Sequence, residues 1–495
     1  MKTKLIRRPL AASLALLLGG CMVGPNYQRP QVDVPAHFQE LPGWTQAGPA
    51  ADAPKGDWWT GFNDPLLNQL EPLVSVSNQT VRQDYANYQE ALAEVRIARS
   101  ALFPVIGITS SATRQRNGSG NLSNAAASAG GGSFQSVNNS ASLEGNVSWA
   151  PDLWGQVRRT IEESAATAQA SEALLANATL SEQIALASAV IDLRVTDANT
   201  DLLQGTVDAD QQYLRVVADQ DKAGTVPPSN LITARTQLEN AQASLIALGV
   251  ARAQYAHAIA VLVGKNPEDL SIPHNATLPT LPDIPGAVPS TLLQRRPDIA
   301  TAERQVASAN AAIGVAIAAY YPNVSLSALD GFTASPLVGL LQAANHVWSL
   351  GASASENLFD GGERSGQVAA ARAAYEATVA NYRGTVLTAF EDVENDLAGL
   401  RVLAQQTKVL DDAVNDATHG AQIAFNEYRA GTVDYTTVSV ALTTQLAIQE
   451  SALSAKQQRL LDAASLIGDL GGGWSASQLH DPRHPDQQVS DKSGT

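Results

Sequence analysis

Cysteine is almost absent from this chain, since Cys21 is the one thiol in 495 residues. A single cysteine excludes a disulfide within the chain. Aromatic residues make up only 5% of the sequence and charged residues 16%, whereas Ala, Ser, Thr and Gln are abundant. This composition predicts alanine-rich helices that pack closely around a thin core, rather than one large globular core.

Sequence motifs for catalysis are missing too. We find no HExxH zinc motif, no cysteine pair and no P-loop, and the seven histidines are scattered along the chain. No Gly-x-Ser-x-Gly nucleophile motif occurs either. We therefore expect no enzyme activity, no catalytic residue, no metal and no cofactor.

Positive charge is scarce. The chain has 32 Lys and Arg against 48 Asp and Glu, a net charge of −16, and four of the positive residues lie within its first eight positions. This balance argues against nucleic acid as a partner. It suits a water-filled conduit that disfavours anions, and it equally suits the solubility of an acidic secreted protein.

The first twenty residues read as a signal peptide. A basic start precedes an apolar run over 10–18, about half the ~20 residues that would span a bilayer. Leu18-Gly19-Gly20-Cys21 resembles a bacterial lipobox, which implies that Cys21 begins the mature chain and carries lipid, palmitate included. Several acyl chains anchor firmly, because each buried CH₂ contributes roughly 0.8 kcal/mol. Met22, in place of Asp, implies outer-membrane sorting, and the alternative for Cys21 is an unpaired buried thiol.

Beyond the leader, no stretch offers 18 apolar residues, which argues against a membrane-spanning helix. Four segments of about ten residues instead have the length of tilted transmembrane strands, at about 105–116, 139–149, 323–332 and 348–358. Aromatic residues gather at their ends, as in an interfacial belt: Phe103, Trp149, Trp154, Tyr320, Tyr321, Trp348 and Phe359. Four strands cannot close a barrel, so a membrane sheet requires an oligomer. Two soluble hairpins packed on helices are the alternative.

The sequence repeats itself. An offset of 207 residues separates Gly155 from Gly362 and also Ala223 from Ala430. Each half predicts a helix, two strands and two long helices, and 154–222 and 363–481 contain no proline. Apolar residues in these runs recur at spacings of three, four and seven, as in coiled-coil seams, for example Ile184, Ala187, Ile191, Val195, Tyr382, Val386, Val393 and Leu397. About 69 residues in one helix would span roughly 100 Å.

Two copies of an Ala-Gly-Thr-Val motif interrupt the long helical runs. Glycine readily adopts the left-handed conformation that ends a helix, so both motifs predict hairpin tips. Pro227, Pro228 and Ser229 suit the start of the following helix in the first half, and Asp434 is expected to cap it in the second. The geometry of the turn is sufficient to explain the two glycines without any functional role.

Several motifs together resemble one family: Cys21-Met22-Val23-Gly24-Pro25-Asn26-Tyr27, Leu292-Leu293-Gln294-Arg295-Arg296-Pro297-Asp298, Val261-Leu262-Val263-Gly264, Trp348-Ser349-Leu350-Gly351 and Leu358-Phe359-Asp360-Gly361-Gly362. They are similar to those of outer membrane factor lipoproteins, the NodT branch of TolC-like efflux channels. The resemblance implies a mostly α fold with a membrane β-barrel. Three chains would share twelve strands and a long helical periplasmic tunnel.

The resemblance also implies a division of the chain. Residues 1–20 are the signal peptide, 21–60 a lipidated segment that joins an equatorial belt, and 265–296 an equatorial linker. The two structural repeats would occupy 61–264 and 297–470, with a tail over 471–495. The Arg295-Arg296-Pro297-Asp298 run fits a structural role at the start of the second repeat, because Pro297 suits a first helical turn and Asp298 its positive end.

The implied function is a passive exit duct in the outer membrane of a tripartite efflux system. Its implied partners are its own copies, outer membrane lipid, a periplasmic adaptor and an inner-membrane pump, usually of the resistance-nodulation-division type. In the family the adaptor docks near motifs that match Ala223, Gly224, Thr225, Ala430, Gly431 and Thr432. Two other functions remain open: a duct for protein or oligosaccharide secretion, and a structural coiled-coil lipoprotein that does not span the membrane.

The periplasmic gate departs from the family pattern. Relatives often carry aspartates six and nine residues beyond the second tip glycine, but this chain has Thr437 and Val440 there. We expect closure through packing and hydrogen bonds of Tyr428, Asp434 and Tyr435 instead. The sequence does not identify the substrate, because a wide tunnel imposes little selectivity.

Overall fold

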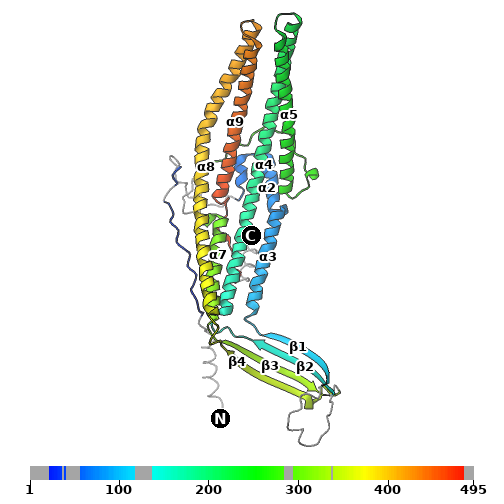
Figure 1. The fold of residues 1–495 in the computed structure, drawn as a ribbon, viewed down its shortest axis with the longest axis vertical. Coiled ribbons are helices and arrows are strands. Elements are labelled where there is room, and N and C mark those ends of the chain that lie inside the picture. Colours follow the sequence, from blue (N-terminus) through cyan, green and yellow to red (C-terminus); the bar gives the residue numbers. More distant parts are fainter. Residues whose placement is uncertain are drawn as a thin grey trace, which may run out of the picture.

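The computed structural model describes residues 22–35, 38–40, 56–116, 137–283, 294–335 and 338–483. They form a long helical stalk with a four-stranded sheet at one end (Figure 1). The signal peptide, Cys21 and the loop over 117–136 lie outside the described residues.

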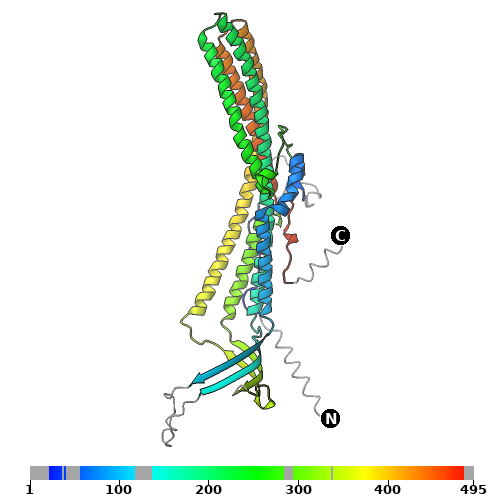
Figure 2. The ribbon, with the colours of Figure 1, turned by 90° about the vertical axis from the view of Figure 1, so that its right-hand side faces the viewer.

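The helices of the stalk reproduce the predicted duplication. The two longest, α4 (Gln156–Lys222) and α8 (Glu363–Arg429), have 67 residues each and run most of its length. Each is followed by a 35-residue helix, α5 (Pro228–Leu262) or α9 (Tyr435–Asp469), which folds back along it. The starts of α8 and α9 follow those of α4 and α5 at the offset predicted from the motifs. Figure 2 shows the two resulting hairpins side by side in the half of the stalk away from the sheet.

Shorter helices fill the half of the stalk nearer the sheet. α3 (Gln79–Ser100) and α7 (Pro297–Ala318) have 22 residues each, and both pack against α4. α2 (Pro65–Ser77) begins with a proline at its first position, and the Asp64 side chain accepts hydrogen bonds from the amides of Leu66 and Leu67. Short 3-10 turns lie at Trp58–Phe62, Pro267–Asp269, Ala343–Asn345 and Ala476–Gln478.

Both long helices begin in the same way. Gly155 and Gly362 precede them with φ angles of 84° and 100°, in the left-handed region that glycine tolerates. The carboxylate of Asp152 accepts backbone N–H groups of the first turn of α4, and Asp360 does so for α8. Because these acids sit at the positive helix ends, they stabilise the point where each strand becomes a helix.

The sheet is antiparallel, in the order β1-β2-β3-β4 (Val105–Arg116, Val137–Trp149, Asn323–Ala334, His346–Ser355). The first three strands lie within two residues of their predicted bounds, but β4 spans 346–355 rather than 348–358. Within the described chain, β1 and β4 each pair on one side only. Trp348 lies near the start of β4, at the end of the sheet away from the helices, so the predicted aromatic residues occupy both ends of the sheet.

Of the four apolar clusters in the described part of the stalk, two have the most buried members. The larger lies in its middle, and its buried members include the predicted seam residues Ile191, Tyr382, Val386, Val393 and Leu397. The smaller lies at the hairpin tips, and it comprises Val217, Ala234, Ala424, Tyr428, Tyr435 and Val438. A long thin body cannot bury one central core, so these local clusters stabilise its parts.

The hydropathy of two helices differs from our sequence expectation. α4 and α5 each contain an 18-residue window that is long and apolar enough to cross a membrane by composition. These windows are rich in alanine, and the two helices pack against each other in the stalk.

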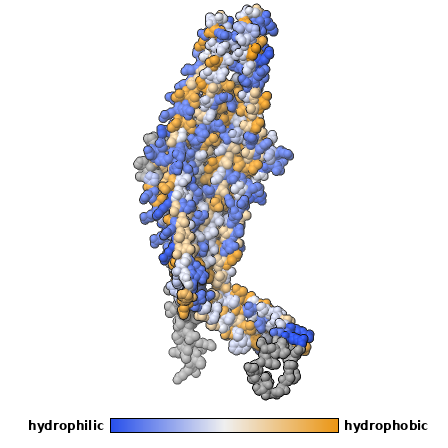
Figure 3. All heavy atoms as spheres, in the orientation of Figure 1, coloured by the Kyte–Doolittle hydropathy of each residue, from blue (hydrophilic) through white to orange (hydrophobic). Residues whose placement is uncertain are grey.

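Apolar side chains also cover much of the sheet in the view of Figure 3.

Candidate functional site

The structure places both tip motifs at the exposed ends of the hairpins. Gly224 and Gly431 have φ angles of 68° and 75°. The backbone N–H of Thr225 donates to Gln220 O at 3.0 Å, and that of Thr432 donates to Glu427 O at 3.0 Å. This is the glycine-terminated helix end that the sequence predicts.

The tip threonines have a clear structural role. The hydroxyl of Thr225 donates to Gln220 O at 2.9 Å, and the hydroxyl of Thr432 donates to Glu427 O at the same distance. Each threonine thus satisfies one of the last carbonyls of its helix twice. Ala223 and Ala430 carry small side chains exposed to solvent. The motif therefore builds the turn, and its exposed surface stays available for a partner.

Tyr428 and Tyr435 pack against each other just inside the tips. Their ring centroids are 5.4 Å apart in an edge-to-face arrangement, and only 4% and 1% of the residues are exposed. The Tyr428 hydroxyl donates to Oε1 of Gln220 on α4. Burial raises the pKa of Tyr435, so its hydroxyl remains neutral at physiological pH.

Asp434, the third residue of the predicted gate, lies on the surface of the chain. Asp434 holds the N-cap position of α9, but its side chain accepts no capping hydrogen bond; its backbone oxygen accepts the N–H of Thr437 at 3.0 Å. This corrects the expected capping role. Thr437 and Val440 are also exposed, on the first turns of α9. Of the three predicted gate residues, the two tyrosines are thus buried within the chain, whereas Asp434 is exposed.

A second polar link between the hairpins escaped the sequence analysis. Oγ of Ser439 on α9 donates to Oε1 of Gln237 on α5 at 2.6 Å. Nε2 of Gln237 in turn donates to Oδ1 of Asp210 on α4 at 3.4 Å. Asp210 is 2% exposed, its Oδ2 has no hydrogen-bond partner within the described chain, and desolvation raises its pKa to about 6. An acid at a buried seam position is the sequence signal that could have revealed it.

The N-terminal segment forms a strap along the stalk, on the left of Figure 1. The strap, residues 22–35, is held by the Arg159 side chain, which donates to the backbone oxygens of Val23 and Gly24 at 3.0 Å each and is 1% exposed. Farther along, Tyr27 hydrogen-bonds to Glu303, and Nε of Arg29 donates to the Tyr382 hydroxyl at 3.2 Å. The strap therefore connects α4, α7 and α8.

The Arg296 side chain confirms the structural interpretation of the Arg-Arg-Pro-Asp run. Arg296 is buried and pairs with Asp298, Asp392 and Asp469 at 2.8, 3.3 and 3.0 Å. α7 begins at Pro297, directly after it. Arg296 thereby ties the start of α7 to α8 and α9.

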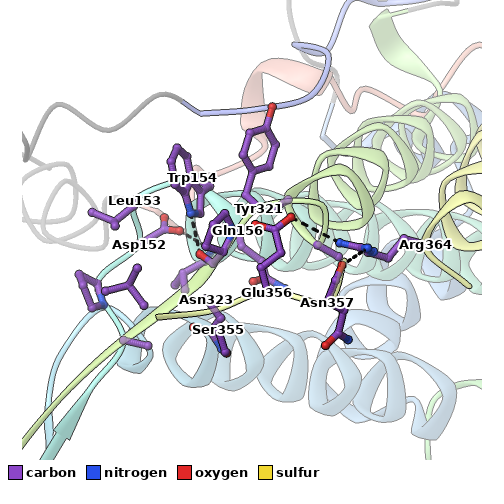
Figure 4. Close-up of a pocket in the computed structure, with 17 residues that line it drawn as sticks. Asp152, Leu153, Trp154, Gln156, Tyr321, Asn323, Ser355, Glu356, Asn357 and Arg364 are labelled. Carbon is purple, nitrogen blue, oxygen red and sulfur yellow. Dashed lines mark hydrogen bonds and ion pairs between the residues drawn. The ribbon is translucent and has the colours of Figure 1, made fainter. Parts of the chain in front are cut away.

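A cavity of about 360 Å³ lies where the strands become helices (Figure 4). In this collar pocket Trp154 and Tyr321 stack with ring centroids 5.0 Å apart, and Trp154 Nε1 donates to Pro322 O at 2.8 Å. Glu356 and Arg364 line the opposite side. The sequence did not predict that these residues meet, because Trp154, Tyr321 and Glu356 lie in three different connections and Arg364 lies on α8.

Comparison with known proteins agrees with this architecture. The family model described as outer membrane efflux protein matches residues 73–265 and 288–472. The probable efflux pump outer membrane protein TtgC of Pseudomonas putida is 30% identical over 470 residues, which cover 94% of this chain and 95% of the relative. The solved outer-membrane channel OprN is 28% identical with a TM-score of 0.83, over 92% of this chain and 100% of that chain. The CmeC channel of Campylobacter jejuni, at 22% identity and a TM-score of 0.86 over 96% and 98% of the chains, supports the fold alone.

A long stalk with a small, open-edged apolar sheet defines the class of TolC-like outer membrane channels. This chain belongs to the outer membrane efflux protein family. It is an outer membrane channel protein of an efflux system, with its helices extending into the periplasm. The family is one of transport ducts rather than enzymes.

Proposed function

We propose that three copies of the chain form one closed duct, with a twelve-stranded barrel in the membrane and a tunnel of their long helices below it. The duct is passive: a periplasmic adaptor connects it to an inner-membrane pump of the resistance-nodulation-division type, which supplies the energy. The observation that carries this proposal is the open sheet. β1 and β4 have one unpaired edge each in the described chain, and lipid offers no partners for backbone groups.

Exposed apolar residues lie where neighbouring copies would join. β1 begins and β4 ends at the helical end of the sheet, so pairing of β4 with β1 of the next copy brings 356–359 close to 103–105. Leu358 and Phe359 are 94% and 90% exposed in the single chain, and Phe103 and Val105 are also exposed. Burying such side chains contributes about 1.5–3 kcal/mol each, which favours closure of the ring.

Oxidative cross-linking tests the trimer. The double variant Phe103→Cys with Phe359→Cys should produce a ladder that ends at three chains, whereas either variant alone should not. The pair Val105→Cys with Ser148→Cys, opposed within one chain, serves as a control for access of the oxidant. A control pair that cross-links while the seam pair stays monomeric would contradict the proposal. Purified trimer should also conduct ions in planar bilayers, which a non-spanning lipoprotein would not do.

The exposed tips support docking of an adaptor at Ala223, Gly224, Thr225, Ala430, Gly431 and Thr432. Thr225→Val and Thr432→Val would remove the helix-terminating hydroxyls, so they report on the turn rather than on docking. Ala223→Arg and Ala430→Arg add bulk to a surface without disturbing the turn. We expect loss of adaptor co-purification and drug resistance in these arginine variants, with bilayer conductance intact. Resistance that is unchanged in both would remove the tips from the interface.

We also propose that Cys21 carries the lipid anchor. Met22, the next residue, lies against Gly155 at the collar, the level at which an anchor would enter the membrane. Mass spectrometry of the purified chain should show a mature protein that starts at Cys21 with added acyl mass. An unmodified thiol, or retention of the leader, would contradict the anchor.

A further inference from the structure

We infer that the collar pocket binds the headgroup of an ethanolamine phospholipid from the periplasmic leaflet of the outer membrane. The proposal rests on the proposed membrane insertion of the sheet and adds a lipid site to it. The pocket combines one basic and one acidic side chain, Arg364 and Glu356, with an aromatic wall. A phosphoethanolamine group carries one negative and one positive charge side by side and so matches that pair.

Arg364 is fixed in place but not saturated. Its Nε pairs with Asp360, its Nη2 hydrogen-bonds to the backbone oxygen of Asn357, and its guanidinium carbon lies 5.2 Å from the centre of the Tyr320 ring. Its Nη1 is 3.8 Å from Oε1 of Glu356, too far for a hydrogen bond. Nη1 therefore retains donor capacity toward a phosphate oxygen.

Glu356 supplies the complementary charge. Its side chain is 32% exposed and lies in the pocket between Tyr321 and Arg364 (Figure 4). An ammonium group held there would donate a charged hydrogen bond to the carboxylate and face the stacked Tyr321 and Trp154 rings. The side-chain amide oxygen of Asn357, which also lines the pocket, offers a further acceptor.

The carboxylate of Glu356 selects among headgroups. Asp152 pairs with Arg158 at 3.0 Å and Arg364 with Asp360 at 2.5 Å, whereas the nearest cation to Glu356 is Nη1 of Arg364 at 3.8 Å. A glycerol phospholipid head adds a negative charge and no cation, so it meets repulsion from Glu356. A choline head has a cation but no N–H donor for Glu356 or Asn357. Ethanolamine is the head that satisfies both charges and the acceptors.

The surroundings of the pocket place it at the lipid surface. The strap reaches it from the exterior: the Val23 N–H donates to Trp154 O at 3.1 Å, and a Cβ on Gly155 would collide with Met22. Trp149 and Trp154 both turn their indole N–H groups to backbone oxygens of the collar, as aromatic residues do at a membrane interface. Leu153 projects beside the pocket as an apolar contact for an acyl chain.

Native mass spectrometry of the detergent-purified trimer, titrated with single lipids, tests the site. Phosphatidylethanolamine should bind in up to three copies per trimer, more tightly than phosphatidylcholine or phosphatidylglycerol. Glu356→Gln should weaken ethanolamine lipid binding by about tenfold, the value of one charged hydrogen bond, and so remove the preference. Glu363→Gln is the matched control, because Glu363 lies next to Arg364 at the start of α8 but does not line the pocket.

Conductance of the same samples distinguishes failure of the lipid-site proposal from failure of the proposed duct function. All variants should still form pores, since Glu356 supports no helix end. Equal binding of the three lipids, or an unchanged preference in Glu356→Gln, would overturn the lipid site while leaving the duct intact. Ethanolamine selectivity that appears only when Cys21→Ser removes the anchor would also overturn it, because the anchor would then be the natural occupant. Wild-type protein that neither trimerises nor conducts would contradict the proposed function itself.

Discussion

The hydroxyl of Tyr428 donates a hydrogen bond of 2.5 Å to Oε1 of Gln220, and so joins the ends of α8 and α4 across 208 residues of sequence. Ser439 and Gln237 form another polar link between the two hairpins. The hairpins of the two halves of the duplicated chain are thereby joined near their tips.

Removing this hydroxyl should loosen the closed state. Tyr428→Phe keeps the edge-to-face contact with Tyr435 and deletes the bond to Gln220, which contributes about 1 kcal/mol. We expect a higher frequency of spontaneous openings in single-channel recordings. Tyr435→Phe should differ little from wild type, because ring packing is its main contact, whereas Tyr435→Ala would create a cavity. Closed-state leakage that is unchanged in Tyr428→Phe would remove this link from the gate.

Asp434 provides the separate test of the exposed part of the gate. If its carboxylate helps close the pore against a neighbouring copy, Asp434→Ala should raise leakage without changing the stability of one chain, since its side chain caps nothing. Glu427→Ala, an exposed acid on the last turns of α8, is the control. Equal leakage in wild type and Asp434→Ala would exclude Asp434 from the gate.

Ionisation of Asp210 should weaken the tips. Its pKa is raised to about 6 by burial, so the folded tip favours the neutral acid, and stability falls as the pH rises from about 4 through 6. Hydrogen exchange of peptides that cover 206–214 should therefore be slower, after correction for intrinsic rates, at pH 5 than at pH 7.5. Asp210→Asn should exchange slowly at both values. A wild-type difference that persists in Asp210→Asn would assign the effect to another group.

Glu71 is expected to limit stability at the middle of the stalk. Its side chain is fully buried, both carboxylate oxygens lack partners within the described residues, and desolvation raises its pKa to about 9. The raised pKa means that unfolding releases a proton, so stability declines from pH 4.5 to pH 9. Glu71→Met should stabilise the protein by about 2–3 kcal/mol at pH 8 and by little at pH 5.

Denaturant unfolding at both pH values measures this difference. Glu90→Gln, at an exposed position of α3, is the control and should change neither value. A loss of stability in Glu71→Met at pH 8 would show that the carboxylate has a partner in the assembled channel.

The strap should detach from α7 when a side chain is introduced at Gly24, where the two backbones are in close contact. Gly24 has a φ of 90°, and a Cβ there would lie 2.5 Å from Cα of Gly314. Gly24→Val is therefore expected to expose 22–35 to limited proteolysis, with the stalk still helical by circular dichroism. Gly56→Val, at a site with nothing within 4 Å, should leave the cleavage pattern unchanged. A protected strap in Gly24→Val would mean that α7 can shift to accept the side chain.

Local patterns accounted for most of the elements. The offset between Gly155 and Gly362 located both strand-to-helix junctions, and the tip glycines located both turns. These positions could be predicted because a left-handed backbone conformation requires glycine at one position and depends on no distant residue. The spacing of the seam residues predicted the buried faces of α4 and α8 for a similar reason. The spacing of apolar residues shows which face of a helix is buried, but it does not show which element packs against that face.

The sequence by itself therefore determined the duplicated plan, the long helices and the short strands. Only the tertiary structure decided which distant polar groups meet: Asp210 with Gln237, Arg159 with the strap, and Glu356 with Arg364 in the collar pocket. These contacts depend on the rotation and lateral order of packed helices, and no residue spacing records either. Desolvation depends on them as well, so Glu71 and Asp210 became identifiable as perturbed acids only when the surrounding helices were in place.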